Sequence, residues 1–423
     1  MTHSHEQPHR RANHGPLPCS AHRVPVVLCT VLWLSVAGTG SLPAADGVKP
    51  ALPYTKQPPG VVITHQAAAT RQYLGSPALA ILPSGEYLAS HDFFGPGSSR
   101  DRTQLFASSD RGQSWKLRSS LVGQWWSSLF VHRGAVYILG TSKEYGQCVI
   151  RRSMDAGQTW TEPRDEQTGL LLAEGKYHCA PVPVVEFQGR LWRAMEDAEG
   201  PGGWGSHFRA FVMSAPVDAD LLKASSWQTT NRIARDPHWL GGKFGGWLEG
   251  NVVVTPDQQL VNLLRVENAS HPERIARLTV GEQGRTLMFD PAKDFIPFPG
   301  GAKKFTIRFD AKSGRYISLV NAVPATFRNR KPASTRNTLV LASSADLNQW
   351  ELHQVVLSNP DPVAHGYQYV DWLFDDADLA AVVRTAHDDG IGGAHNQHDS
   401  NLILFVRVPD FRAALAKKFD LDR

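Results

Sequence analysis

Two stretches of the sequence nearly repeat each other: SSDRGQSW at Ser108–Trp115 and SMDAGQTW at Ser153–Trp160. Both follow the pattern Ser-x-Asp-x-Gly-x-Ser/Thr-Trp, and they begin 45 residues apart. The residue types suit a tight turn, because Asp accepts backbone N–H groups, Gly tolerates a positive φ and Trp covers a large apolar area. We therefore interpret Asp110 and Asp155 as structural residues of a repeated turn rather than as catalytic carboxylates.

Short apolar runs recur along the rest of the chain, among them ALAILPSGEYLAS, SLFVHRGAVYILG and VPVVEFQGRLWRA. Each has an internal turn signal and is typical of a β-hairpin. Helical periodicity is confined to Val217–Ala224 and to FRAALAKKFD near the C-terminus. A weaker copy of the repeated turn, SSADLNQW, places Asp346 in a third turn of the same kind.

The repeat length indicates the architecture, because units of 40–50 residues with four strands each are typical of β-propellers. The sequence predicts an all-β, six-bladed β-propeller with four-stranded antiparallel blades. A strand from the N-terminal part is expected to complete the last sheet. We count six repeats, at 66–117, 118–162, 176–228, 243–290, 303–352 and 365–409.

The first 45 residues differ from the rest. Three arginines precede the apolar run VPVVLCTVLWLSVA, and the small-residue stretch GTGSLPAAD follows it. This order is typical of a secretory signal peptide, and fourteen apolar residues are short for a membrane anchor, which is the alternative. We expect a secreted or periplasmic protein without a membrane span. The predicted organisation is a signal peptide at 1–45, a lead-in at 46–65, the propeller at 66–410 and a tail with a short helix at 411–423.

The composition excludes several classes of partner. The formal charge of the 423 residues is +4, and loss of three Arg and one Glu with residues 1–45 lowers it to +2 without leaving a basic block, so nucleic acid is not expected. Cys148 and Cys179 are the cysteines that remain, and in an oxidising compartment they have the option of pairing. No Cys/His spacing typical of zinc occurs, and we expect no metal, no cofactor and a monomer.

The repeated turns resemble the Asp-box (BNR) repeats of the sialidase superfamily, and the resemblance extends through residues 66–409. In that family the boxes lie on the outer rim, and single residues near the central axis carry the chemistry. The segment WLEGNVVVTPDQQLVNLLRVEN is similar to the family's Glu–strand–turn–strand–Arg segment. The resemblance implies that Glu249 is the catalytic Glu and that Arg265 binds the substrate carboxylate. RNTLVLASSADLNQW implies the same binding role for Arg336.

The resemblance also implies a nucleophile and an acid/base. YQYVDWLFDDADLAAVV matches the family's nucleophile segment at Tyr369, with Tyr367 as the adjacent alternative, and GSSRDRTQLFASSD matches the acid/base loop at Asp101. A free Tyr has a pKa near 10 and is a poor nucleophile until a base takes its proton. Glu249 would be that base, and sialidases are the exception among retaining glycosidases in using Tyr.

One element of the family pattern is missing. Sialidases have an arginine in their first blade that completes a triad on the substrate carboxylate, whereas YLGSPALAILPSGEYLAS has Gly75 at that place. Arg71 and Arg100 are the nearby arginines that would have to compensate. This departure puts unmodified sialic acid hydrolysis in question, although not the fold.

Several further residues are candidates for substrate binding. His178 lies at a predicted strand start, and His398 lies in the Gly-rich tract AHDDGIGGAHNQHDSN. We group Asp92 with them. Trp125, Trp126, Trp204 and Trp247 exceed what the boxes require, and either pack between blades or stack against sugar rings.

The sequence therefore predicts a secreted enzyme that binds a glycan or oligosaccharide, a retaining exo-glycosidase of the sialidase type that acts on an acidic sugar with altered specificity. Two alternatives stay open. The first is a uronate lyase or a rhamnosidase-like enzyme that uses central His, Tyr and Arg residues. The second is a noncatalytic glycan-binding propeller.

Overall fold

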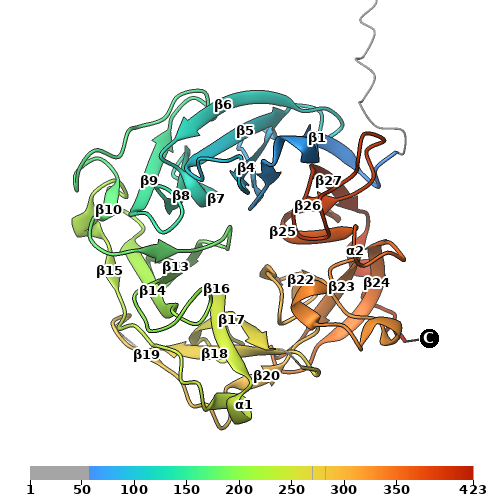
Figure 1. The fold of residues 1–423 in the computed structure, drawn as a ribbon. Coiled ribbons are helices and arrows are strands. Elements are labelled where there is room, and N and C mark those ends of the chain that lie inside the picture. Colours follow the sequence, from blue (N-terminus) through green and yellow to red (C-terminus); the bar gives the residue numbers. More distant parts are fainter. Residues whose placement is uncertain (1–56, 269, 282, 423) are drawn as a thin grey trace, which may run out of the picture. The chain divides into compact units, whose positions relative to one another are not determined.

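The computed structural model describes residues 57–268, 270–281 and 283–422, which belong to one compact unit. Six antiparallel β-sheets follow one another around a ring in chain order (Figure 1). The described residues thus form an all-β, six-bladed β-propeller with four-stranded blades, and the predicted fold is confirmed; in blades 1, 3 and 4 two short strands share one of the four positions and pair with the same neighbour. The predicted signal peptide lies outside the described residues. No helix among them is long and apolar enough to cross a membrane.

The first three blades contain strands β2 to β15. Blade 1 comprises β2 (Tyr73–Leu74), β3 (Ala78–Ile81), β4 (Tyr87–Phe94), β5 (Arg102–Ser108) and β6 (Lys116–Val122). Blade 2 comprises β7 (Trp125–His132), β8 (Ala135–Thr141), β9 (Cys148–Ser153) and β10 (Leu170–Leu172). Blade 3 comprises β11 (Tyr177–His178), β12 (Val185–Phe187), β13 (Arg190–Asp197), β14 (Arg209–Pro216) and β15 (Gln228–Thr229).

The last three blades contain the remaining strands. Blade 4 comprises β16 (Phe244–Val254), β17 (Leu260–Asn268), β18 (Arg274–Val280), β19 (Leu287–Met288) and β20 (Phe295–Pro297). Blade 5 comprises β21 (Ile307–Asp310), β22 (Arg315–Val320), β23 (Thr338–Ser344) and β24 (Glu351–Ser358). Blade 6 comprises β25 (Gly366–Asp375), β26 (Asp378–Ala386), β27 (Leu402–Val408) and β1 (Val61–His65).

The N-terminal strand closes the ring. β1 pairs antiparallel with β27, with Val61 opposite Phe405 and His65 opposite Leu402. This is the strand that was expected to complete the last sheet, and it begins within the segment interpreted as a lead-in. Because closure joins the first described strand to the last one, the ring leaves no sheet unpaired at the seam.

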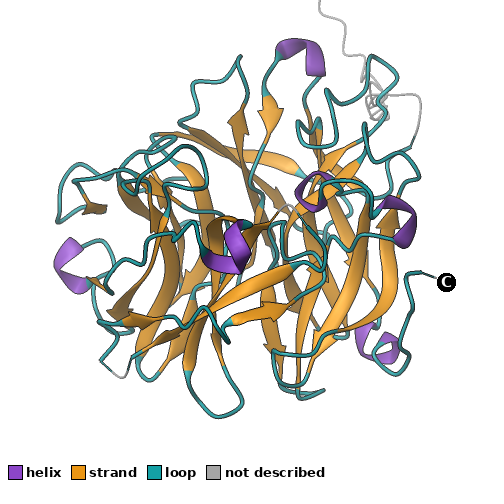
Figure 2. Ribbon diagram, turned by 60° about the horizontal axis from the view of Figure 1, so that its bottom comes forward, coloured by secondary structure: helices purple, strands orange, loops and turns teal. Residues whose placement is uncertain are grey.

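The helices are short and lie on loops outside the sheets (Figure 2). α1 spans Trp239–Gly242 and α2 spans Phe411–Ala414, near the C-terminus. The segment Val217–Ala224, whose spacing suggested a helix, forms turns that lead into the 3-10 helix Ala224–Ser226 instead. Its apolar residues Leu221 and Leu222 are buried against blade 3, so packing explains the periodicity without a helix.

The repeated turns join neighbouring blades at the rim. Asp110 Oδ1 accepts hydrogen bonds from Ser108 Oγ at 2.7 Å and from Ser114 N at 2.9 Å, so its carboxylate is used inside its own turn. The Trp115 ring lies 5.6 Å from the ring of Phe405 in blade 6. Asp155 and Asp346 accept the equivalent bonds from Ser153 Oγ and Ser344 Oγ, at 2.8 and 3.0 Å.

Candidate functional site

A cavity of about 330 Å³ lies where the first residues of the innermost strands meet around the axis. Its wall combines residues from blades 1, 2, 3 and 6, which are far apart in the sequence. The lining residues include Tyr73, Gly75, Asp92, Phe94, Arg100, Trp125, Trp126, Glu144, His178, Trp204, Tyr369, Arg384, His398 and Asp399. The cavity therefore collects the polar residues that the ring directs toward its centre.

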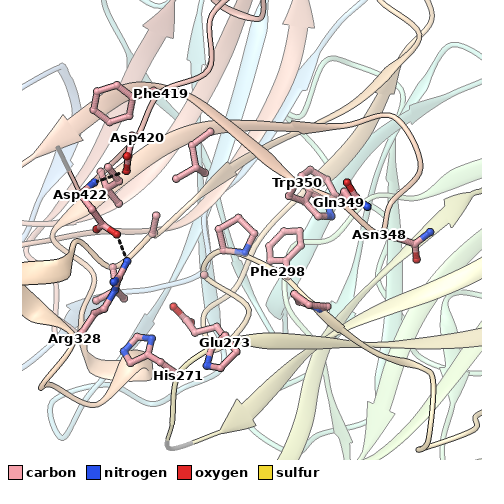
Figure 3. Close-up of a pocket in the computed structure, with 18 residues that line it drawn as sticks. His271, Glu273, Phe298, Arg328, Asn348, Gln349, Trp350, Phe419, Asp420 and Asp422 are labelled. Carbon is pink, nitrogen blue, oxygen red and sulfur yellow. Dashed lines mark hydrogen bonds and ion pairs between the residues drawn. The ribbon is translucent and has the colours of Figure 1, made fainter.

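Several larger cavities, of about 480 to 940 Å³, lie elsewhere. One of about 810 Å³ lies beside the C-terminal segment, where Asp422 forms an ion pair with Arg328 and a backbone hydrogen bond to Asp420 (Figure 3). Another, of about 940 Å³, has a mainly aliphatic and aromatic wall that includes Val254, Phe309 and Phe374. Asp92, His178 and Arg384 are buried and line the axial cavity together with Tyr369, and Glu249 and Arg265 contact Tyr369 from behind this wall, so we place the candidate site there.

The innermost strands of blades 4 and 6 each contain a β-bulge at the site. In β16, Leu248 pairs with Arg265 and Asn251 with Leu263, so two residues face one on the partner strand. The first extra residue is Glu249, with φ 56°, and the equivalent bulge in β25 carries Tyr369, with φ 53°. A positive φ is costly for residues other than glycine, and such residues cluster at functional sites.

The two bulges bring a phenol and a carboxylate together. Tyr369 Oη donates a hydrogen bond to Glu249 Oε1 at 2.7 Å. Arg265 Nη1 lies 3.0 Å from Glu249 Oε2 and 3.4 Å from Tyr369 Oη, and Arg265 Nη2 lies 3.2 Å from Glu267 Oε2. The charge of Arg265 is therefore matched by two carboxylates within the protein.

The pKa values of this pair are set by burial and by the neighbouring charges. Burial acts to raise the pKa of Glu249, but Arg265 and then His178 outweigh it, so the pKa of this carboxyl lies below its usual value. Burial, followed by Glu249, raises the pKa of the Tyr369 phenol. At neutral pH the site therefore holds a protonated phenol that donates to an ionised carboxylate.

Two further arginines lie against the Tyr369 ring. The guanidinium of Arg384 on β26 lies 4.7 Å from the ring centroid, and that of Arg336 lies 5.9 Å from it. Arg336 Nε donates to the Ala333 carbonyl at 2.8 Å, and Arg384 Nη2 donates to the His398 carbonyl at 2.5 Å.

Both of these arginines are buried, and neither forms an ion pair with a carboxylate among the described residues. Arg384 Nε has no hydrogen-bond partner there either. Burial, and then Arg265, lower the pKa of Arg336 to about 10, and burial also lowers the pKa of Arg384. Two cations thus remain without a matching anion beside the reactive pair.

A carboxylate occupies the place next to Gly75. A Cβ atom at residue 75 would lie 1.9 Å from Asp92 Oδ1, so the side chain of Asp92 fills the space that a larger residue would need. Asp92 Oδ2 accepts the backbone N–H of Trp126 at 2.9 Å. Burial raises the pKa of Asp92 to about 7, which makes it a carboxyl group that is half protonated near neutral pH.

Neither arginine considered as a replacement for the missing one is free beside Gly75. Arg100 lines the cavity, but it forms an ion pair with Glu144. Arg71 is not among the lining residues. Among the lining residues, the arginine that forms no ion pair with a carboxylate is Arg384, which the sequence did not single out.

Asp101 does not line the cavity. Its Oδ1 accepts a hydrogen bond from Ser99 Oγ, and its carbonyl oxygen accepts the N–H groups of Gly123 at 2.8 Å and Gln124 at 3.1 Å. The structure thus places Asp101 in a loop contact between blades 1 and 2. Tyr367, the alternative nucleophile, is buried in the core between blades 5 and 6.

The two histidines are both in the cavity wall. His178 Nδ1 lies 3.0 Å from Glu196 Oε2, and its ring stacks on Phe208 with centroids 4.2 Å apart. His398 Nδ1 lies 2.7 Å from Asp399 Oδ1. Among the described residues, no group of three or more His, Cys, Asp or Glu side chains is arranged to hold a metal ion.

The sequence matches neither a family model nor a curated protein. Solved structures of similar fold include an α-L-arabinanase of Penicillium chrysogenum complexed with arabinobiose, at 15% identity and a TM-score of 0.51 over 85% of this chain and 99% of that one. A Hadza microbial sialidase is similar at 13% identity and a TM-score of 0.55, over 83% of this chain and 68% of that one. The α-L-arabinofuranosidase of Fusarium graminearum is similar at 13% identity and a TM-score of 0.52, over 83% of this chain and 97% of that one. The chain is thus a six-bladed β-propeller structurally like sialidases and arabinose-acting glycoside hydrolases.

Proposed function

We propose that this protein is a retaining exo-glycosidase that acts on an acidic sugar, with Tyr369 as its nucleophile. The observation that carries the proposal is the 2.7 Å hydrogen bond from Tyr369 Oη to Glu249 Oε1 in a buried site with three arginines. A phenol next to an ionised carboxylate is the arrangement that an activated nucleophile requires. The likeness of the fold to glycoside hydrolases supports the same class of reaction.

The reaction has two steps. In the first, Tyr369 Oη forms a bond to the anomeric carbon while its proton passes to Glu249, and the bond to the leaving oxygen breaks as Asp92 protonates that oxygen. In the second, Asp92 takes a proton from a water molecule that attacks the same carbon. The phenolate then leaves and recovers its proton from Glu249. Two inversions at one carbon retain the anomeric configuration.

Asp92 is a better acid/base candidate than Asp101 because of its position and its pKa. It lines the cavity, whereas Asp101 does not. Its pKa of about 7 leaves it protonated in the free enzyme at slightly acidic pH and ionised once it has donated its proton.

The preference for an acidic sugar follows from Arg336 and Arg384. Buried cations are unfavourable without a counterion, and an anionic group of the substrate would supply one. Arg265 contributes less to this binding, because Glu249 and Glu267 already match its charge.

The test is a panel of 4-methylumbelliferyl glycosides of N-acetylneuraminic acid, glucuronic acid and arabinofuranose. We expect turnover of an acidic glycoside and about a 10³-fold loss of kcat in Tyr369→Phe, which keeps the ring but removes the nucleophilic oxygen. Turnover of the arabinofuranoside alone would contradict the preference for an acidic sugar. Absence of turnover with every glycoside between pH 4 and pH 9 would refute the glycosidase.

A uronate lyase is the second candidate, and one observation favours it. His178 lies in the cavity wall with its Nδ1 fixed by the buried Glu196, so its other nitrogen is oriented to take a proton. A lyase would produce an unsaturated uronate from an acidic polysaccharide, which is measured by ultraviolet absorbance. Loss of that product in His178→Ala, with Tyr369→Phe active, would favour the lyase.

We also propose that the protein is exported, as the composition of residues 1–45 predicts. Fractionation of cells that express the full chain tests this, because the exported protein would be shorter at its N-terminus.

A further inference from the structure

The β-bulge that presents Glu249 and Tyr369 occurs a third time, in blade 2. In β7, Trp125 pairs with Thr141 and Ser128 with Leu139, so two residues again face one. The first extra residue is Trp126, with φ 50°. Three alternate blades therefore have a left-handed residue at an equivalent place on the innermost strand, and two of the three are the reactive pair.

The bulge in β7 depends on a small residue opposite it. A Cβ atom at Gly140 would lie 2.2 Å from Ser127 Oγ and 2.4 Å from the Trp125 carbonyl oxygen. The Trp126 side chain is half-buried and lines the cavity, and its ring packs edge-on against His178 with centroids 4.4 Å apart. Its backbone N–H also binds the Asp92 carboxyl.

These contacts determine on which side of the site a leaving group lies. The unpaired arginines, Arg336 and Arg384, come from blades 5 and 6 and lie against the Tyr369 ring. Asp92, which protonates the leaving oxygen in the proposed reaction, accepts a hydrogen bond from the backbone of Trp126 in blade 2, which lies across the six-bladed ring from blade 5. A sugar whose anionic group binds the arginines therefore directs its leaving group toward blades 2 and 3.

An exposed tryptophan lies on the side of blades 2 and 3. Trp204 lines the cavity, and 54% of its surface is exposed. Its loop is held by hydrogen bonds from His207 N to the Gly203 carbonyl at 3.1 Å and from Phe208 N to the Gly205 carbonyl at 3.4 Å. The Trp204 ring rests edge-on against the fully buried Phe208, at 6.0 Å.

We propose that Trp126 and Trp204 form a subsite for the sugar ring of the leaving group, and that the substrate is therefore an oligosaccharide rather than a small glycoside. The subsite rests on the proposed function. Aromatic faces offer a large apolar area at a low cost in conformational entropy, and the C–H faces of a pyranose ring pack against them. His178, which packs against Trp126 and against the Phe208 that supports Trp204, is placed to supply a polar contact to the same ring.

The kinetic test compares two substrates that share one acidic sugar. The first is a lactoside, 3′-sialyllactose, and the second is N-acetylneuraminyl fluoride. If the glycoside panel identifies another acidic sugar, the lactoside and the fluoride of that sugar replace them. The fluoride has no leaving-group ring. We expect Trp204→Ala to lower kcat/KM for the lactoside about tenfold and to leave that for the fluoride within about twofold.

The control variant is Phe309→Ala, which removes an aromatic residue of similar exposure, 51%, from a different cavity. This control should change kcat/KM for neither the lactoside nor the fluoride. Trp204→Tyr, which keeps an aromatic ring, should recover most of the kcat/KM lost on the lactoside. Equal losses on both substrates, or no loss on either, would overturn the subsite.

Calorimetry separates failure of the subsite from failure of the proposed function. In the Tyr369→Phe background, the lactoside should bind about tenfold more weakly when Trp204→Ala is added, whether or not the unmodified protein hydrolyses it. Hydrolysis of neither substrate would refute the glycosidase, and binding would then decide the subsite. Unchanged or undetectable binding of the lactoside would overturn it.

Discussion

The raised pKa of Asp92 predicts that the protein loses stability as the pH rises. The carboxyl has a pKa of about 7 in the folded chain, because burial disfavours its charged form, and an ordinary pKa of 3.8 when exposed. Between these values the folded chain binds the proton and the unfolded chain does not. The stabilisation is therefore fully present below about pH 4 and is lost as the pH rises through about 7.

The magnitude follows from the difference between the two pKa values. Each pH unit in the window contributes about 1.4 kcal/mol, so the total is about 4 kcal/mol, of which about 3 kcal/mol lies between pH 5 and pH 8. Asp92→Asn should remove this slope, because an amide of similar shape does not titrate and still offers an oxygen to the Trp126 N–H.

The difference between the two proteins must be measured, because other groups also titrate. His91 next to Asp92 has a pKa lowered to about 4 by burial, and it therefore contributes a slope of opposite sign between about pH 4 and pH 6.5. Urea unfolding at pH 5, 6, 7 and 8, followed by tryptophan fluorescence, gives the free energy of unfolding for both proteins.

We subtract the free energy of unfolding of the unmodified protein from that of Asp92→Asn at each pH. This difference should rise by about 3 kcal/mol from pH 5 to pH 8. Parallel pH profiles would refute the reasoning, because they would mean that Asp92 titrates normally in the folded chain. Activity gives a second measurement. With a methylumbelliferyl glycoside, kcat/KM should fall above about pH 7 in the unmodified protein and be at least about 10²-fold lower in the variant.

Three further predictions concern other parts of the site and the rim. Gly75→Ala should lower kcat/KM at least about tenfold, because its Cβ would meet Asp92 Oδ1 at 1.9 Å and displace the acid; steady-state kinetics measure this, and unchanged activity would contradict it. Arg384→Met should raise KM for an acidic glycoside about tenfold or more while its Tm stays the same or rises, because it removes a buried unpaired cation. Asp110→Ala should lower Tm by a few degrees in calorimetry without changing kcat, because its carboxylate is bonded inside an outer turn.

The fold was predictable because its signals are local and repeated. The turns at Asp110, Asp155 and Asp346 use equivalent hydrogen bonds in blades 1, 2 and 5, so the pattern in the sequence marks the structural unit. Closure by β1 followed from counting strands, since the last repeat lacks one. The spacing at Val217–Ala224 failed as a helix signal because burial of two leucines produces the same pattern in a chain of turns.

The candidate site was only partly predictable. Tyr369 and Glu249 were reached through segments that resemble a known family, and the structure brings their side chains together. Arg384 carried no such signal, because it lies one residue beyond the segment that resembles the family's nucleophile segment, and only the path of β26 brings it to the Tyr369 ring. Trp126 was one of four tryptophans for which the sequence left both packing and sugar stacking open, and the sequence did not predict the bulge that presents it, because a bulge is a difference in length between two paired strands and leaves no mark on either strand alone.

The absence of an arginine at residue 75, where Gly75 lies instead, explains the raised pKa of Asp92. A guanidinium at residue 75 would favour the ionised form of the neighbouring carboxyl and lower its pKa. Without it, burial dominates, the Asp92 pKa stays at about 7, and the carboxyl retains a proton to donate. The unpaired cations then lie in blades 5 and 6, and on the wall of blades 2 and 3 the carboxylate of Glu144 is already paired with Arg100, which leaves the aromatic rings of Trp126 and Trp204 to contact a neutral leaving group. Gly75→Arg should therefore reduce activity rather than restore sialidase-like binding, because it would both ionise Asp92 and occupy its space.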